Sequence, residues 1–68
     1  MKSVSARDLV NAVERKGWVL LGVHGSHQIY GREGSTVRLS IPVHEGRDLK
    51  VGLVRHLMNR AGVSEDDL

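Results

Sequence analysis

The pattern of hydrophobic and polar residues has a helical period near both ends of the chain. Leu9, Val10 and Val13 recur at the spacing of one helix face, behind a Ser-x-x-acid cap. Residues 5–16 are therefore expected to form a helix. A second helical pattern ends at a glycine, and its apolar face is made of Leu53, Val54, Leu57, Met58 and Ala61. Gly52 costs roughly 1 kcal/mol relative to Ala inside a helix, so either the helix begins near it or something approaches its backbone closely.

Between the two helical patterns the chain has the composition and the period of β-strands. Residues 18–23 are apolar and too few for a helix between two glycines, which predicts a short buried strand. Residues 27–32 and 36–41 are expected to form two further strands, and the second of these has the clearest alternation of polar and apolar positions. The Gly-rich turn at residues 31–35 predicts that they pair as a hairpin, and Pro42 ends the last strand.

The order helix, three antiparallel strands, helix predicts an α+β fold with both helices on one face of the sheet. The other face of the sheet is then left open. The length suits one small domain, so residues 1–68 are expected to form a single unit. Because the chain has no Phe, we expect an aliphatic core with Trp18 and Tyr30 as its large aromatic side chains.

Composition excludes several classes of protein. Without cysteine the chain has neither a disulfide framework nor a thiolate zinc site, which suits a reducing cytoplasm. The longest apolar run, residues 18–21, is too short to cross a membrane, and no signal peptide is recognisable. The formal charge is +2, and three of the last four residues are acidic, so the body of the chain is more basic than the total. This charge favours a polyanionic partner such as RNA.

The run Gly25-Ser26-His27 lies at the joint between the first two expected strands, where glycine allows a tight turn or the close approach of a ligand. Imidazole takes or gives a proton near neutral pH, as cleavage of RNA by its own 2′-hydroxyl requires. In this hypothesis His27 is the acid or base and Ser26 lies near the phosphate. Arg38, at an outward position of its strand, and Lys50, just before the second helix, are the candidate cations.

Other interpretations of the histidines are also open at this point. A histidine at a strand start is most often structural, and alternation places His27 on the same side as Ile29, which is the covered side if Ile29 faces the helices. His24, His27 and His44 do not predict a metal site, because residues three apart on a strand point to opposite faces and no cysteine is present. The Ser-His pair lacks the nucleophile elbow of a hydrolase.

The order KGW…GSHQIY…TVRLSIPVH…LKVGLVRHLMNRAGVS is similar to that of the HicA family of toxins, small ribonucleases of prokaryotic toxin–antitoxin systems. The resemblance covers essentially the whole chain. It implies a fold like the double-stranded-RNA-binding domain, with the order α-β-β-β-α. It also implies cleavage of mRNA without metal or other cofactor, a catalytic role for His27, and neutralisation by a HicB-type antitoxin protein that covers the toxin.

The Pro-Val-His motif of this pattern ends at His44, to which the resemblance assigns no role. On chemical grounds His44 is our choice for the second proton-transfer group, and Lys50 is the electrostatic alternative. Two other functions are weighed against the ribonuclease. One is a non-catalytic RNA-binding module of the same fold, which binds by shape and phosphate contacts. The other is a family member that only binds its antitoxin.

Overall fold

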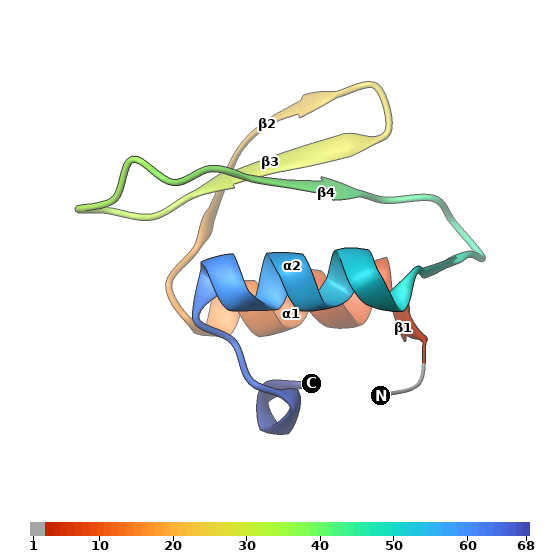
Figure 1. The fold of residues 1–68 in the computed structure, drawn as a ribbon. Helices are drawn as coiled ribbons and strands as arrows, with labels where there is room; N and C mark the ends of the chain where they lie inside the picture. The colour runs from red at the N-terminus through yellow and green to blue at the C-terminus, as the bar shows by residue number, and fades with distance from the viewer. Residues whose placement is uncertain (1–2) are drawn as a thin grey trace.

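Two helices lie side by side beneath a three-stranded antiparallel sheet in the computed structural model, which describes residues 3–68 (Figure 1). The helices are α1 (Ala6–Arg15) and α2 (Val51–Ala61). The strands, in their spatial order, are β2 (Val19–His24), β3 (His27–Gly31) and β4 (Leu39–Pro42). This arrangement confirms the predicted α+β fold with the order α-β-β-β-α of the double-stranded-RNA-binding domain.

Two small elements complete the fold, and the first of them was not predicted from the sequence. Strand β1 (Val4–Ser5) pairs with β5 (Asp48–Leu49), and this short ladder joins the starts of the two helices. A 3-10 helix, η1 (Glu65–Asp67), follows α2 and carries a capping box at Ser64. Lys16, next to the end of α1, pairs with Asp67 at 3.5 Å, which holds η1 against the first helix.

Both helices begin and end close to their expected residues. The Ser5 hydroxyl accepts a hydrogen bond from the Asp8 backbone N–H at 3.1 Å, as an N-cap does. Helix α2 begins at Val51, and a Cβ added to Gly52 would meet nothing within 4 Å. Gly52 therefore belongs to the first turn of the helix, and no other part of the described chain approaches it closely. Gly62 ends α2 with φ +72°, a conformation that favours glycine.

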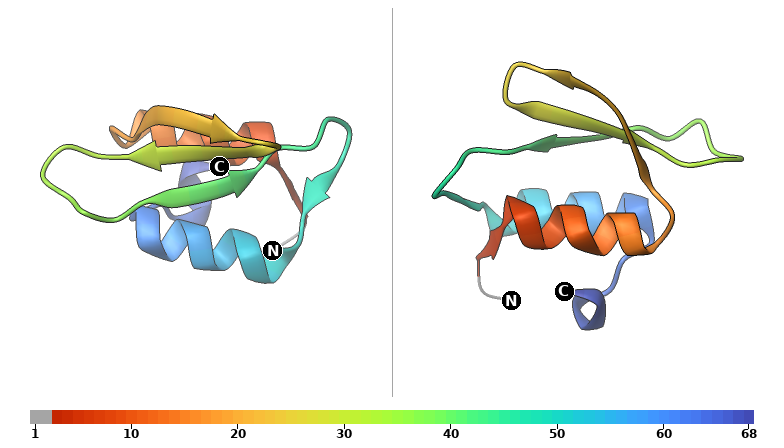
Figure 2. Two further views of the ribbon diagram at one scale, coloured as in Figure 1. Left: turned by 90° about the horizontal axis from the view of Figure 1, so that it is seen from above. Right: turned by 180° about the vertical axis from the view of Figure 1, so that it is seen from behind.

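The expectation that residues 18–23 form a buried strand is wrong. Strand β2 is an edge of the sheet, and Val19, Leu20, Leu21 and Val23 are 44% to 59% exposed. Figures 1 and 2 show the reason, because the end of the β2–β3 hairpin rises away from the two helices. An apolar run indicates a strand, but it does not say whether other elements reach that strand to cover it.

The third strand of the sheet is also shorter than predicted. The alternating pattern begins at residue 36, whereas β4 begins at Leu39. The pair Tyr30–Leu39 is the last one in the ladder between β3 and β4, and β3 ends one residue later at Gly31. Residues 36–38 therefore have no strand beside them to pair with.

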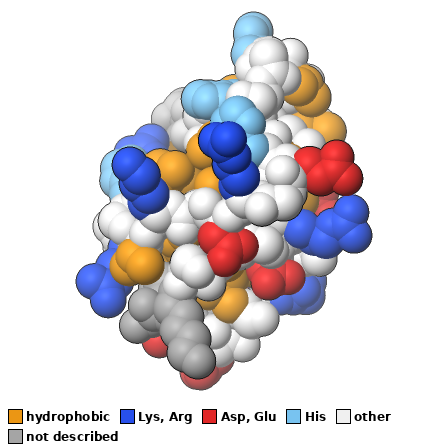
Figure 3. Space-filling view, turned by 90° about the vertical axis from the view of Figure 1, so that its right-hand side faces the viewer, with side chains coloured by type: hydrophobic (Ala, Val, Ile, Leu, Met, Phe, Trp, Pro, Cys, Tyr) orange, Lys and Arg blue, Asp and Glu red, His pale blue; other side chains and the backbone are white. Residues whose placement is uncertain are grey.

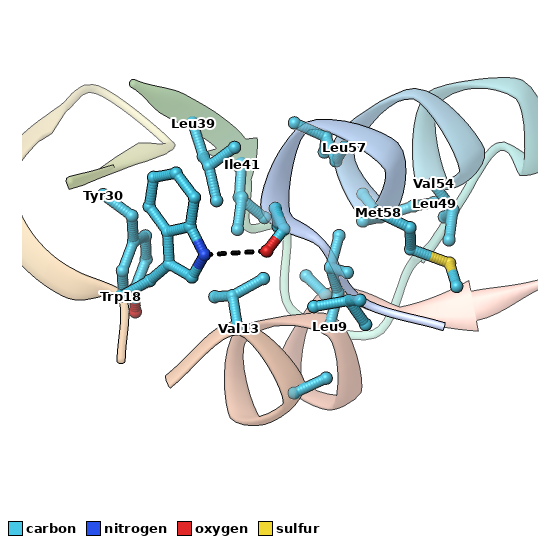
Figure 4. Packing of buried hydrophobic residues seen from close by; sticks show 14 residues of the cluster. Leu9, Val13, Trp18, Tyr30, Leu39, Ile41, Leu49, Val54, Leu57 and Met58 are labelled. Atoms are coloured by element: carbon cyan, nitrogen blue, oxygen red, sulfur yellow. Dashed lines mark hydrogen bonds between the residues drawn. The ribbon is translucent and has the colours of Figure 1, made fainter. Parts of the chain in front are cut away.

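The core lies between the sheet and the helices, and both aromatic residues belong to it as predicted (Figure 4). Trp18 is 2% exposed and Tyr30 is 1% exposed. The Trp18 indole N–H donates a hydrogen bond to the Ala61 carbonyl at 3.0 Å. That carbonyl belongs to the last turn of α2, where helix carbonyls have no partner within the helix. Trp18 thus ties the start of β2 to the end of the second helix. The remaining buried side chains are aliphatic and include Leu9, Val13, Leu39, Ile41, Val54, Leu57 and Met58.

Tyr30 fixes β3 against α1 through its hydroxyl group. The hydroxyl oxygen lies 3.0 Å from Glu14 Oε2 and 3.2 Å from the side-chain amide of Gln28. Because a phenol carries one proton, the hydroxyl donates to the charged Glu14 carboxylate, which is the stronger acceptor. Burial and the Glu14 carboxylate raise the pKa of Tyr30 to about 12. The neutral phenol is therefore the form that the folded chain holds.

Replacing Tyr30 with Phe is expected to lower the free energy of unfolding by about 1–2 kcal/mol at neutral pH, because the bond to the Glu14 carboxylate is lost. Since the pKa of Tyr30 is higher in the folded chain than its ordinary value of 10.0, the unfolded chain loses this proton first. The stabilising contribution is thus complete below pH 10 and falls as the pH rises toward 12.

Urea unfolding followed by the fluorescence of Trp18, the single tryptophan, measures both effects. The wild type should lose stability relative to Tyr30→Phe between pH 10 and pH 12, and Tyr30→Phe serves as the matched control for every other group that titrates there. Equal stability of the two proteins at neutral pH would show that the Glu14 contact contributes nothing.

Candidate active site on the open sheet face

A two-residue turn places two histidines opposite each other at the end of the sheet. Gly25 has φ +61° and Ser26 has a negative φ, which is the pattern of a type II′ turn between antiparallel strands. In this register His24, the last residue of β2, is the direct partner of His27, the first residue of β3. The Val43 N–H donates to the Ser26 carbonyl at 2.7 Å, so the turn is also tied to the chain that leaves β4.

His27 lies on the face of the sheet that the helices leave open. Side chains alternate along a strand, and Tyr30 of β3 is buried toward the helices together with Leu39 and Ile41 of β4. His27 and Ile29 therefore share the opposite face, where His27 is exposed and Ile29 is half-buried. The alternation argument was correct, but the condition that Ile29 faces the helices is not met. Tyr30, the larger side chain, takes that side.

The His27 imidazole is held by Ser40, a residue of the neighbouring strand. His27 Nδ1 lies 3.1 Å from Ser40 Oγ, and the two residues are diagonal neighbours on the open face. When the hydroxyl accepts a hydrogen bond from Nδ1–H, the lone pair of neutral imidazole is on Nε2. In that tautomer the contact orients the ring and leaves Nε2 as the unprotonated nitrogen.

His44 lies near the same turn but faces another part of the surface. Its Nε2 is 3.4 Å from Ser26 Oγ, a long contact that links the loop after β4 to the turn. His44 also lines a cavity of about 640 Å³ at the start of α1, together with Ser5, Ala6, Arg7, Val43, Glu45, Gly46, Arg47 and Asp48. The recorded contacts of His44 are therefore with the turn and with this cavity, and none is with His27.

The two candidate cations lie in different parts of the fold, Arg38 beside the end of β3 and Lys50 at the start of α2. The Arg38 guanidinium lies against Gly31 on the open face, within 3.1 Å of the place where a Cβ of that glycine would be. Gly31 and His27 are four residues apart on β3, which corresponds to roughly 13 Å along the strand. Lys50 is the N-cap residue of α2, is exposed, and makes no side-chain cap bond. Arg38 donates hydrogen bonds to the Ser35 and Val37 carbonyls, and no contact of Arg38 or Lys50 with His27 is recorded.

The end of the molecule that carries the turn has an uneven distribution of charge. Figure 3 shows histidine side chains at the top of this end, Lys and Arg beside and below them, and acidic side chains mainly lower on the same face. The three strands β2, β3 and β4 carry no Asp or Glu. The open face around the two opposed histidines therefore has no carboxylate of its own strands to repel a phosphate.

Two further residues belong to this part of the surface, and the sequence alone assigned neither of them a role in the chemistry. They are Ser40, which contacts His27, and His24, which is paired with His27. The register of the hairpins brings each of these residues next to His27. A two-residue turn at Gly25-Ser26, had it been predicted, would have paired His24 with His27.

Within residues 3–68 no group of three or more His, Cys, Asp or Glu side chains is placed to hold a metal ion. No helix in this part of the chain is long and apolar enough to cross a membrane.

Comparison with known proteins identifies the family. No curated protein matches the chain. Residues 6–63 match the family model described as the HicA toxin of bacterial toxin–antitoxin systems, and this match runs from the first residue of α1 to just beyond α2. The matched segment contains α1, α2, the three strands of the sheet and the Gly25-Ser26-His27 turn. The chain therefore belongs to the HicA family of bacterial toxins.

Proposed function

We propose that this chain is an endoribonuclease that cleaves mRNA without a metal ion, with His27 acting as a general acid or base. The observation that carries the proposal is the position of His27. Its side chain is exposed on the open sheet face, and Ser40 contacts the ring at Nδ1, which leaves Nε2 for proton transfer. Membership in a family of toxins supports a role in arresting growth, which for an mRNA target takes place in the cytoplasm.

The proposed reaction needs little from the protein, because the RNA carries its own nucleophile. His27 Nε2 removes the proton from the 2′-hydroxyl, and the 2′-oxygen forms a bond to the adjacent phosphorus. The bond from phosphorus to the 5′-oxygen breaks, and this oxygen leaves with a proton supplied by a second group. The products are a 2′,3′-cyclic phosphate and a 5′-hydroxyl. An open sheet face fits this chemistry, because a long strand of RNA can lie across it.

The basic residues of the chain supply the electrostatic part of the mechanism. Arg38 lies on the same face as His27 but about 13 Å along β3, so we assign it to a phosphate away from the cleaved one. Lys50 adds its charge to the N–H groups at the start of α2, which favour anions. Gly25 allows the tight turn, and Ser26 supports it through its contacts with His44 and Val43.

We also propose that a HicB-type antitoxin covers this toxin and uses the exposed edge of β2. An edge strand presents unpaired N–H and C=O groups, and proteins usually protect such an edge with charge or proline. Here Val19, Leu20, Leu21 and Val23 are exposed instead, and the strand has no charged residue before His24.

The basic body of the toxin favours an acidic partner. Arg32 lies over the Trp18 ring at 4.7 Å, near the start of β2, and His24 ends the strand. An apolar strand of the antitoxin flanked by acidic residues would match both the edge and the charges at its ends. This partner would also lie beside the open face and keep RNA away from His27.

Replacing His27 with Ala is expected to abolish RNA cleavage and growth arrest while the chain keeps its fold. Loss of a general acid or base lowers the rate by about 10²–10⁴-fold. Because the His27 side chain is exposed, its removal leaves the packing of the hydrophobic core unchanged. His56→Ala is the matched control, because His56 is an exposed histidine on α2. Cleavage by His27→Ala at the wild-type rate, with an unchanged circular dichroism spectrum, would falsify the assignment.

Cleavage by the wild type is expected to continue in EDTA and to leave a 2′,3′-cyclic phosphate or the 3′-phosphate formed from it. The reason is that the 2′-hydroxyl and His27 together supply the nucleophile and the proton transfer. Mass spectrometry of the fragments identifies their ends. A 3′-hydroxyl end would indicate attack by water, and binding of RNA without any cleavage would indicate the non-catalytic RNA-binding module instead.

Replacing Val23 with Lys is expected to weaken neutralisation by the HicB-type antitoxin by at least tenfold, because a charge would face the apolar strand laid along β2. The matched control is Leu68→Lys, which changes another exposed apolar residue far from this edge. RNA cleavage at increasing antitoxin concentrations measures the effect. Equal inhibition of Val23→Lys and the wild type would place the antitoxin elsewhere on the toxin.

A further inference from the structure

We propose that His24 is the second proton-transfer group and donates the proton to the leaving 5′-oxygen. This proposal rests on the proposed ribonuclease function and adds to it the partner that His27 needs. It assigns a role to a residue that lies outside the Gly-Ser-His motif.

The register of the hairpin places the two imidazoles together. His24 and His27 are direct partners across a two-residue turn, so their side chains leave the same face of the sheet. Their Cβ atoms are then about 5 Å apart, as in any directly opposed antiparallel pair. Both residues are exposed. Both side chains therefore leave the open face at the end of the hairpin, His24 from β2 and His27 from β3, with the His27 ring in contact with Ser40 of β4.

The reaction needs one group that accepts a proton and one that donates a proton, close together at the same phosphate. In an in-line displacement the 2′-oxygen approaches phosphorus from one side and the 5′-oxygen leaves from the other. His27, oriented by Ser40 with Nε2 outward, takes the proton from the 2′-hydroxyl. His24 begins the step protonated and gives its proton to the 5′-oxygen as the phosphorus–oxygen bond breaks. Afterwards His27 carries one more proton and His24 one fewer, so the protons balance.

The other titratable residues near the turn are less suitable as the proton donor. His44 faces the cavity at the start of α1 and contacts Ser26. Arg38 lies along the open face beside Gly31, and guanidinium does not release a proton at neutral pH. From the helix side, Glu14 of α1 contacts Tyr30 beneath the sheet. The strands β2, β3 and β4 contribute no carboxylate, and His24 is the acid that the open face offers beside His27.

The test compares His24→Gln, His44→Gln and His27→Gln with the wild type, and uses His56→Gln as the control on α2. The substrate is a short RNA that the wild type cleaves. For His24→Gln we expect kcat to fall by about 10²–10⁴-fold while the Kd for uncleaved RNA stays within a factor of two. The pH–rate profile should lose its descending limb, because that limb reports the group that must be protonated.

A second substrate separates the acid from the base. When sulfur replaces the 5′-oxygen at the cleaved bond, the leaving thiolate needs no proton. This substrate should restore cleavage by His24→Gln to near the wild-type rate and leave His27→Gln inactive. His56→Gln should behave as the wild type with both substrates.

Three results would overturn the role of His24: wild-type kcat for His24→Gln, an unchanged descending limb, or rescue by the sulfur substrate in His44→Gln instead. Each of these leaves the proposed ribonuclease intact as long as His27→Gln is inactive. Wild-type cleavage by His27→Gln would contradict the proposed function itself.

Discussion

The burial of Tyr30 is the constraint on which the arrangement of this small fold depends. The chain has two aromatic side chains, and Tyr30 occupies the centre of the contact between the sheet and α1, where it donates its hydroxyl proton to Glu14. Because side chains alternate along a strand, this one placement decides which way every other residue of β3 faces. A slip by one residue would expose Tyr30 and turn His27 into the core. The stability of the fold and the exposure of His27 therefore depend on the same side chain.

The one-sided covering of the sheet explains how so small a chain provides a site. Two helices are enough to bury Tyr30, Leu39 and Ile41 on one face, and the other face stays available along its whole length. A domain of this size has little volume for a deep cavity. The proposed chemistry requires no deep cavity, since the RNA brings its nucleophile and a rigid pair of strands holds the histidines. Covering only one face also leaves the apolar edge of β2 exposed to water in the free toxin, and we propose that the antitoxin covers this edge.

Local signals in the sequence predicted the helices and strands better than they predicted which of their side chains are buried. The cap at Ser5 and the left-handed Gly62 placed the helix ends within a residue or two, because capping depends on neighbouring backbone groups. The predicted burial of β2 was wrong and the direction of Ile29 was left open, because both depend on elements distant in sequence. Likewise His27 was proposed from its motif, whereas its contact with Ser40 and its pairing with His24 emerged from strand register.

The central claim is that His27, on the open sheet face, promotes attack by the 2′-hydroxyl of RNA. The most direct measurement uses an RNA that carries a single 2′-O-methyl group at the nucleotide whose 3′-phosphate is cleaved. The account predicts that the wild type binds this RNA as tightly as the unmodified one and does not cleave it at that bond. Cleavage of the modified bond at the normal rate would contradict the account, because water would then be the nucleophile.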